Sequence, residues 1–298
     1  MNFLNVLNAI ERVVRGKREV AEYILAALLG GGHVLLEDIP GVGKTLLALT
    51  IAKITGLEFR RFQFTSDTLP ADVLGTFVFD VKENDFVFRE GPIFTNIFLA
   101  DEINRASPKT QSALLEAMAE GQVTVEGKTF ELPQPFMVIA TQNPLEEWGT
   151  FPLPHSQLDR FMAKTSVGYP PEEIEFEILR GENPYKKLDY LKPMLNRQKI
   201  LKEREAVEKF PVPDRNLKYL HTVVLETRRH PEVLLGVSTR GALHWLAFSK
   251  ALAYIRGFEF LPVEILKESA PVCLSHRLVL KESSLRSAEE IVKEIIET

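Results

Sequence analysis

A short glycine-rich segment carries the residues with the clearest chemistry. Residues 38–45 read DIPGVGKT, between an apolar run and a helical pattern. In a strand–turn–helix of this kind, backbone N–H groups and the positive end of the helix dipole face an anion. Gly41 and Gly43 would let the backbone approach phosphate closely. Lys44 would reach the β and γ phosphates, and the Thr45 hydroxyl would bind Mg²⁺, so the segment predicts a nucleotide site.

This loop departs from the strict phosphate-loop pattern at one position. The pattern has glycine where Asp38 stands in this chain. That glycine starts the turn and does not touch phosphate, so we expect the mismatch to matter little. The alternative is an ordinary strand-to-helix turn that contains an incidental lysine.

Polar side chains follow two further apolar runs. Asn96–Ala100 ends in Asp101 and Glu102, and Phe136–Thr141 is followed by Gln and then Asn143. Ligands of open α/β sheets gather at the carboxyl ends of strands. Neighbours on a strand point to opposite sides, so we assign Asp101 to Mg²⁺ and Glu102 to polarising an attacking water. Asn143 would orient the same water, although an Asn-Pro pair taken alone is typical of a turn.

A parallel sheet is needed to bring these residues together. The first 170 residues alternate apolar runs with helical patterns, which is typical of an α/β layer. Several runs are continuously apolar, as expected for strands covered by helices on both faces. The predicted strands are His33–Glu37, Glu58–Gln63, Asn96–Asp101, Pro135–Thr141 and Phe161–Val167, and the predicted helices between them are Lys44–Thr55 and Pro108–Glu120.

Two segments of this part alternate apolar and polar residues and predict hairpins. They are Thr76–Arg89, which turns around residues 83–85, and Gly121–Leu132, which turns around Glu126 and Gly127. Each is either a solvent-exposed ribbon without a role or an element that contacts a substrate or lines a pore.

Beyond residues 168–171 (GYPP) the chain reads almost wholly as helix. We therefore predict a boundary near residue 170, with an α/β core over residues 1–170 and a helical domain over residues 171–298. The predicted helices are Glu172–Arg180, Arg197–Lys209, Asp214–Arg229, Ser238–Arg256, Val263–Glu268 and Ser287–Glu297.

Composition narrows the class of protein. The 298 residues are 45% hydrophobic and 26% charged, with a net charge of −5, as in a globular protein. An acidic balance argues against a broad basic face for nucleic acid or membrane. The longest apolar stretch, Ile24–Leu36, is too short to span a bilayer, and the N-terminus lacks a secretory pattern. The single Cys273 cannot form an internal disulfide and is expected to be buried, so we predict a cytoplasmic protein.

Taken together, the motifs resemble the MoxR family of AAA+ ATPases. The resemblance implies an AAA+ P-loop core with a five-stranded parallel sheet and a small C-terminal helical lid. It also implies ATP and Mg²⁺ as cofactors, a homo-oligomeric ring, taken as a hexamer, and client proteins, often with von Willebrand factor A domains, that ATP hydrolysis would remodel or activate. The motifs are DIPGVGKT at 38–45, LADEINR at 99–105, TQNP at 141–144, LPHSQLDRF at 153–161 and STRGAL at 238–243.

The resemblance assigns roles to the residues around the nucleotide. By their motifs they are a Walker A loop, a Walker B pair, a sensor-1 residue and an N-terminal segment that packs beside adenine. These are Gly41, Val42, Gly43, Lys44 and Thr45; Asp101 and Glu102; Asn143; and Val14 and Gly16.

Two arginines resemble the remaining catalytic groups of the family. Arg160 looks like the arginine finger offered to a neighbouring subunit, with Arg105 as a second candidate. Arg240 looks like sensor 2, which reaches the γ-phosphate from the lid of the same chain. If Ser238 caps the next helix, Arg240 lies in its first turn, where a cation needs an anion to offset the helix dipole. His155 replaces the usual family glutamate, which leaves the role of that acid in doubt.

Other functions stay open on the sequence. A nucleotide-gated scaffold would bind ATP with little turnover, but the intact Glu102 argues against it. A nucleic-acid motor or a chelatase-like subunit shares the same core, but the acidic charge argues against nucleic acid and a chelatase would need dedicated partners.

Overall fold

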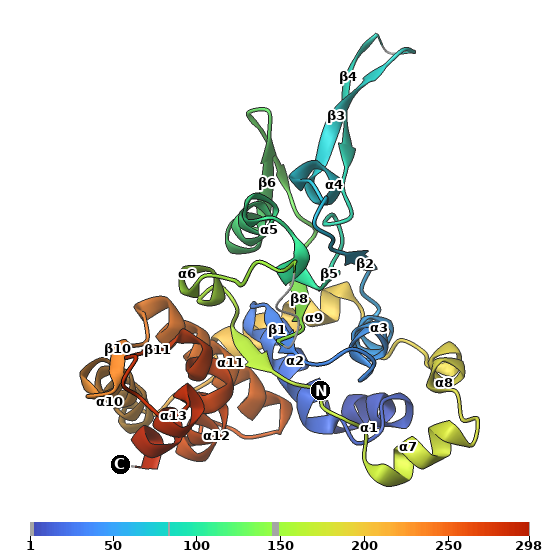
Figure 1. Ribbon diagram of the computed structural model, residues 1–298. Coiled ribbons are helices and arrows are strands. Elements are labelled where there is room, and N and C mark those ends of the chain that lie inside the picture. Colours follow the sequence, from blue (N-terminus) through green and yellow to red (C-terminus); the bar gives the residue numbers. More distant parts are fainter. Residues whose placement is uncertain (1–2, 83, 145–148, 298) are drawn as a thin grey trace.

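The central sheet places side by side the three strands that lead to Lys44, Asp101 and Asn143 (Figure 1). In this computed structural model, which describes residues 3–82, 84–144 and 149–297, five parallel strands pair in the order β2-β5-β8-β1-β9. This confirms the predicted α/β sheet. The strands are β1 (Val34–Glu37), β2 (Phe59–Gln63), β5 (Ile97–Asp101), β8 (Met137–Gln142) and β9 (Ala163–Thr165).

Helices cover both faces of this sheet, which explains its continuous apolar runs. Successive side chains point to opposite faces, so Leu36 and Leu99 share a core with the N-terminal helices, while Leu35 and Phe98 share one with α5. The helices of this part are α1 (Phe3–Val13), α2 (Arg18–Gly30), α3 (Lys44–Thr55), α4 (Pro70–Leu74), the 3-10 turn η1 (Ile103–Arg105), α5 (Pro108–Glu120) and α6 (His155–Leu158).

Both segments predicted as hairpins form antiparallel pairs that project from the sheet, away from the helices at its other end (Figure 1). Residue 83, in the predicted turn of the first, lies outside the described residues. The strands are β3 (Gly75–Asp80) with β4 (Asp85–Glu90), and β6 (Gln122–Val125) with β7 (Lys128–Glu131).

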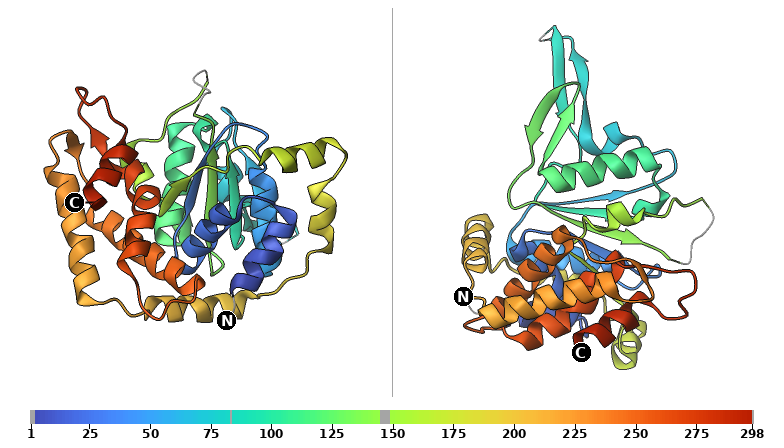
Figure 2. Two further views of the ribbon diagram at one scale, coloured as in Figure 1. Left: turned by 90° about the horizontal axis from the view of Figure 1, so that it is seen from below. Right: turned by 90° about the vertical axis from the view of Figure 1, so that its left-hand side faces the viewer.

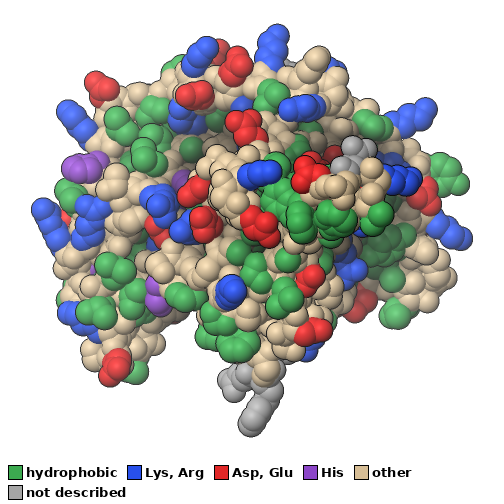
Figure 3. Space-filling view, turned by 90° about the horizontal axis from the view of Figure 1, so that it is seen from above, with side chains coloured by type: hydrophobic (Ala, Val, Ile, Leu, Met, Phe, Trp, Pro, Cys, Tyr) green, Lys and Arg blue, Asp and Glu red, His purple; other side chains and the backbone are tan. Residues whose placement is uncertain are grey.

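The β3–β4 ribbon carries four phenylalanines on one face. Phe88 stacks on Phe130 of β7 with ring centroids 4.0 Å apart, and Phe77 lies beside the same ring. Farther out, Phe79 and Phe86 contact each other but are 51% and 61% exposed. Hydrophobic side chains gather over this end of the molecule (Figure 3). The ribbon is therefore anchored at its base and presents aromatic surface near its tip.

After β9 the chain places its helices on two opposite sides of the core. The helices α7 (Glu172–Leu179) and α8 (Pro184–Tyr190) lie at one side, and a segment that includes α9 (Arg197–Glu208) crosses to the other (Figure 2). The rest of the chain forms the lid there. Its elements are α10 (Asp214–Arg229), β10 (Val233–Leu235), α11 (Thr239–Ile255), α12 (Val263–Leu274), η2 (Ser275–Arg277), β11 (Val279–Leu280) and α13 (Ala288–Glu297).

This route differs from the single helical block expected after residue 170. The core separates α7 and α8 from the lid helices, so the assignment of residues 171–298 to one domain stays a prediction. Among the described residues, no helix is long and apolar enough to cross a membrane. Cys273 on α12 is buried, and burial raises the pKa of its thiol to about 12.

Candidate nucleotide site

The glycine loop connects β1 to α3, and the space next to its two glycines is open. Gly41 and Gly43 have φ angles of +87° and +95°, which favour glycine, and a Cβ added at either would meet nothing within 4 Å. Gly43 precedes α3 without a side-chain cap, so the first N–H groups of that helix are available to an anion. The local backbone therefore fits a phosphate chain.

Lys44 begins α3 and is held by the loop itself. Its Nζ donates to the carbonyl oxygens of Asp38 (2.8 Å) and Ile39 (3.1 Å). Burial lowers the pKa of Lys44, and the charges of Asp38, Asp101 and Glu102 partly offset that effect. The ammonium is thus poised beside the loop with neutral partners that a phosphate oxygen would outcompete.

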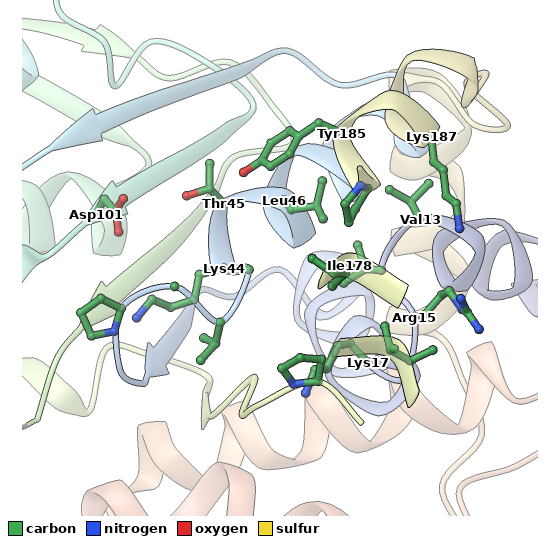
Figure 4. A pocket seen from close by; sticks show the side chains of 18 of the residues that line it. Val13, Arg15, Lys17, Lys44, Thr45, Leu46, Asp101, Ile178, Tyr185 and Lys187 are labelled. Atoms are coloured by element: carbon green, nitrogen blue, oxygen red, sulfur yellow. The ribbon is translucent and has the colours of Figure 1, made fainter. Parts of the chain in front are cut away.

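The loop forms one end of a pocket of about 470 Å³. Lys44, Thr45 and Asp101 lie toward this polar end, whereas Val13 and Ile178 lie toward the other (Figure 4). Such a pocket matches a nucleotide, because the charged phosphates suit the polar end and the base suits the apolar end.

The apolar end is built from two segments. Val14 lines it, whereas Gly16 is not among the described residues that do. Gly16 has φ +72°, and a Cβ added there would lie 2.6 Å from Pro171 Cγ. Ile178 and Tyr185, from α7 and α8, line the same end. The sequence did not point to them, because nothing local shows which cavity an isolated amphipathic helix covers.

Asp101 is buried at the end of β5 with both carboxylate oxygens engaged. Oδ1 accepts from Thr141 Oγ1 (2.6 Å), and Oδ2 accepts from Arg61 Nε (3.0 Å) and Nη2 (2.7 Å). Asp101 and Thr45 line the same pocket and offer a carboxylate and a hydroxyl, the hard oxygen donors that suit Mg²⁺. The donor set therefore fits the predicted cation, with Arg61 as its competitor for Oδ2.

Glu102 follows the last residue of β5 and lines the same pocket as Asp101. Its backbone has φ +57°, a left-handed conformation that few non-glycine residues adopt. Its Oε2 accepts from Gln63 Nε2 (2.7 Å) and lies 3.4 Å from Arg105 Nη1. Arg61 and Gln63 were not predicted, although their spacing along β2 puts both on one face of the sheet, and Gln63 pairs in register with Asp101.

Asn143 also reaches this pocket from the end of β8. It is buried and lines the cavity, and its carbonyl lies 3.4 Å from Asn104 Nδ2. The structure thus gathers the glycine loop, Asp101, Glu102 and Asn143 around one pocket.

The two predicted arginines lie elsewhere. Arg160 lies between α6 and β9 of the core, and Arg240 is on α11 of the lid, on the far side of the core from α7 and α8. Arg160 Nη1 donates to the carbonyl of Leu115 (2.9 Å). Arg240 Nη1 is 3.8 Å from Asp159 Oδ2, a carboxylate that also accepts from Ser238, the cap of α11. Neither arginine is among the described residues that line the pocket. The expected reach of Arg240 to the phosphate of its own chain is therefore not part of this arrangement.

Asp38, which stands where the strict loop pattern has glycine, holds the segment after β9 through its side chain. Its Oδ2 accepts from the backbone N–H groups of Val167 (2.5 Å) and Gly168 (2.7 Å). Lys17 Nζ donates to the carbonyls of Val167 (2.6 Å), Gly168 (3.0 Å) and Tyr169 (2.5 Å). One acid and one amine thus fix the segment that leads from the sheet to α7, and Asp38 joins that segment to the glycine loop.

Comparisons with known proteins agree with this arrangement. Residues 33–163 match the model of the ATPase family associated with various cellular activities (AAA), and residues 225–295 match that of the AAA lid domain. The chain is 45% identical to the uncharacterised protein YeaC of Bacillus subtilis, over 96% of this chain and 91% of that protein. It is 40% identical to the chaperone MoxR1 of Mycobacterium tuberculosis, over 96% and 78%. The crystal structure of a proposed ATPase from Cytophaga hutchinsonii matches with a TM-score of 0.90 and 35% identity, over 99% of this chain and 94% of that one.

Proposed function

This chain belongs to the MoxR family of AAA+ ATPases, and from that premise we propose that it hydrolyses ATP to ADP and phosphate to remodel, assemble or activate other proteins. The observation that carries the proposal is the meeting of three separate segments at one pocket: the glycine loop, the two acids at the end of β5, and Asn143 after β8. An ordinary strand-to-helix turn would not need all three.

Each residue has a role that follows from its place. Lys44 and the loop N–H groups would hold the β and γ phosphates, and Thr45 and Asp101 would hold Mg²⁺. Bound Mg²⁺ would neutralise charge on the phosphate oxygens. Glu102 would polarise the attacking water and Asn143 would orient it. Glu102 must exchange its bond to Gln63 for that water, just as Asp101 must release Arg61 for the cation.

Arg160 and Arg240 are best assigned to the pocket of a neighbouring subunit. Asp159, next to Arg160, accepts from Ser238 and Arg277 of the lid and lies 3.8 Å from Arg240, so both arginines lie on the lid side. The lid and the α7–α8 pair are on opposite sides of the core, so each subunit would offer the arginines to a neighbour in a ring, proposed as a hexamer. For Arg240 this replaces the same-chain role implied by the resemblance. Arg105, which lies 3.4 Å from Glu102 of its own chain, stays the second candidate for the finger.

The projecting hairpins are the proposed client-contacting elements. The exposed phenylalanines near the tip of the β3–β4 ribbon suit apolar segments of another protein, and clients with von Willebrand factor A domains stay a proposal. The chaperone name of MoxR1 supports protein clients over nucleic acid. A cytoplasmic location is proposed on the single, buried cysteine.

Mixing two inactive variants tests the shared site. Arg160→Ala should bind ATP almost normally but hydrolyse it roughly 10³-fold more slowly, because an arginine finger acts mainly in the transition state. Lys44→Ala should fail to bind ATP. A 1:1 mixture should regain part of the activity, since the second variant lends its Arg160 to the intact loop of the first. The matched control is Arg60→Ala, which removes an exposed arginine on β2.

Steady-state phosphate release by the unmodified protein separates the remaining alternatives. Turnover below one ATP per hour with ATP bound would identify a scaffold. Strong stimulation by single-stranded DNA would favour a nucleic-acid motor. A mixture that stays inactive while subunits exchange would remove Arg160 as the finger.

A further inference from the structure

We propose that α7 and α8 form a strap over the apolar end of the nucleotide pocket, and that four paired side chains latch this strap to the core. The strap comprises residues 172–190, and the latch comprises Arg15, Glu177, Glu182 and Lys187. Nucleotide would enter and leave when the latch opens. The inference rests on the proposed function and deepens it, because it names the residues that control nucleotide exchange at the same pocket.

The strap is fastened to the core at both ends. Before α7, the Nζ of Lys17 and the carboxylate of Asp38 bind the backbone of residues 167–169. At the end of α8, the Nζ of Lys53 on α3 donates to the carbonyl oxygens of residues 188 and 189 (2.6 and 3.2 Å). An opening of the strap would therefore be confined to the part between these two lysines.

Between its ends the strap has few buried contacts. None of the eight described residues of α7 is buried, and Leu188, next to the Lys53 anchor, is the only described residue of α8 that is. Ile174 and Ile178 of α7 and Tyr185 of α8 nevertheless line the pocket. Segments with few buried apolar contacts open locally at a low cost in free energy. The part of the chain that covers the apolar end is therefore also a part that can open alone.

An ion-pair network holds the middle of the strap. Arg15, in the loop after α1, pairs with Glu177 of α7, and its Nη1 lies 3.6 Å from Glu182 Oε2. Glu182 in turn pairs with Lys187 of α8. The four side chains are between 30% and 42% exposed, so each pair contributes little alone. Such a network can close the strap and still break often enough for exchange.

The latch lies where two cavities meet. Arg15 and Lys187 line the nucleotide pocket at the end away from the glycine loop (Figure 4). Both also line a second cavity of about 1230 Å³ between α1 and the strap. Basic residues outnumber acidic ones around this cavity, which favours the approach of an anionic nucleotide. They are Arg12, Arg15, Lys187 and Lys192, against Glu11 and Glu173. The second cavity is thus the entry route that the latch closes.

Rates of nucleotide exchange test the latch. Glu177→Gln removes one of its carboxylates, and Glu177 is not among the described residues that line the pocket. Stopped-flow measurements with Mg²⁺ and ADP that carries a fluorescent group on the ribose should show association and dissociation both about 2–5-fold faster, with little change in Kd. Loss of a direct contact to the nucleotide would instead speed dissociation alone and raise Kd. The matched control is Glu175→Gln, which removes an exposed glutamate of α7 that pairs with no described residue.

Tying the latch should have the opposite effect. In the double variant Arg15→Cys/Glu177→Cys, a short reagent that joins two thiols through disulfides would fasten the strap to the core. The buried Cys273 would not compete for the reagent. ADP that is loaded beforehand should stay bound until the link is reduced, and ADP that is added afterwards should not enter. Exchange by the tied protein at the untied rate would overturn the proposal, as would equal rates for the parent and Glu177→Gln.

The outcomes separate the latch from the proposed function. Faster exchange by Glu177→Gln in a protein that releases no phosphate from ATP would keep the latch and reject the ATPase. Phosphate release by a protein whose exchange rates neither variant alters would keep the ATPase and reject the latch.

Discussion

The nucleotide pocket and the junction between core and lid both depend on charged side chains, but they hold them differently. In the pocket, Lys44 contacts two carbonyls and Asp101 contacts Arg61. Those partners can be exchanged for a phosphate and a cation. At the junction, Arg277 has a side chain only 1% exposed. The charged groups of the pocket can therefore exchange their partners for a ligand, whereas the buried charge of the junction joins two parts of the fold.

Arg277 is the centre of the junction. It donates to Asp159 Oδ1 (3.0 Å) and to the carbonyl of Phe161 (2.6 Å), and it lies 2.9 Å from His244 Nδ1. Burial, together with the charge of Arg277, lowers the pKa of His244 to about 4. The neutral imidazole can therefore accept from the guanidinium, and the charge of Arg277 is met by partners within the fold.

The largest expected effects are on the pocket. Lys44→Ala should abolish most ATP binding, whereas Glu102→Gln should keep ATP bound and lower turnover by roughly 10²–10⁴-fold, as for loss of a general base. Fluorescent-nucleotide binding and phosphate release measure the two effects separately. Parent-rate hydrolysis by Glu102→Gln would show that another group acts as the base.

At the junction the expected loss is in stability. Arg277→Met removes the guanidinium from the Asp159 carboxylate, which then keeps only Ser238 and Arg240, and removes a donor from the carbonyl of Phe161. The free energy of unfolding should therefore fall by about 3–5 kcal/mol, as for a broken buried ion pair. Urea denaturation measures it. Arg229→Met, with a side chain 68% exposed, should change it by less than about 0.5 kcal/mol. Equal losses in the two variants would show that the buried contacts of Arg277 contribute no more to stability than an exposed arginine does.

Asp38 belongs to both regions, since it bounds the pocket loop and fixes the segment before α7. Asp38→Gly restores the strict loop pattern, yet it should cost about 1–3 kcal/mol of unfolding free energy because two backbone N–H groups lose their acceptor. Asp38→Asn, which keeps one acceptor oxygen, should cost less. An unchanged unfolding midpoint in Asp38→Gly would show that the bonds to residues 167 and 168 contribute nothing.

The smallest effect concerns pH. His33 is buried, and burial lowers its pKa to about 4, below its ordinary value. Between about pH 6.5 and pH 4, the imidazole of His33 is therefore protonated in the unfolded chain but neutral in the folded one. The free energy of unfolding falls as the pH drops through this range. His33 should account for roughly 1 kcal/mol of the loss between pH 7 and 5.5. His33→Asn should lower stability at pH 7 but flatten the slope below it; an identical slope would refute the assignment.

The sequence was sufficient where function depends on neighbours along the chain. The glycine loop, the acids at the end of β5 and the helices Lys44–Thr55 and Pro108–Glu120 follow from local patterns, and the structure has both helices with those bounds. Propensity misled near Pro271, where α12 continues to Leu274 past the predicted end at Glu268 because its buried face is retained.

Long-range placement could not be predicted. Nothing local shows that α9 carries the lid to the far side of the core, and that route decides whose pocket Arg240 serves. The contacts of Arg61 and Gln63 depend on β2 pairing with β5, a register fixed by tertiary packing. Asp38 did carry a local signal, since an acid in place of the pattern's glycine calls for a partner.

The single cysteine of the chain lies in the lid, and its reactivity can report when the lid opens. Cys273 is fully buried on α12, four residues from Arg277, whose side chain donates to its carbonyl. A buried thiol with a pKa of about 12 cannot react until the helices around it separate. Alkylation of the unmodified protein therefore counts the molecules whose lid has opened, so its rate with and without nucleotide gives the local opening free energy without any engineered label.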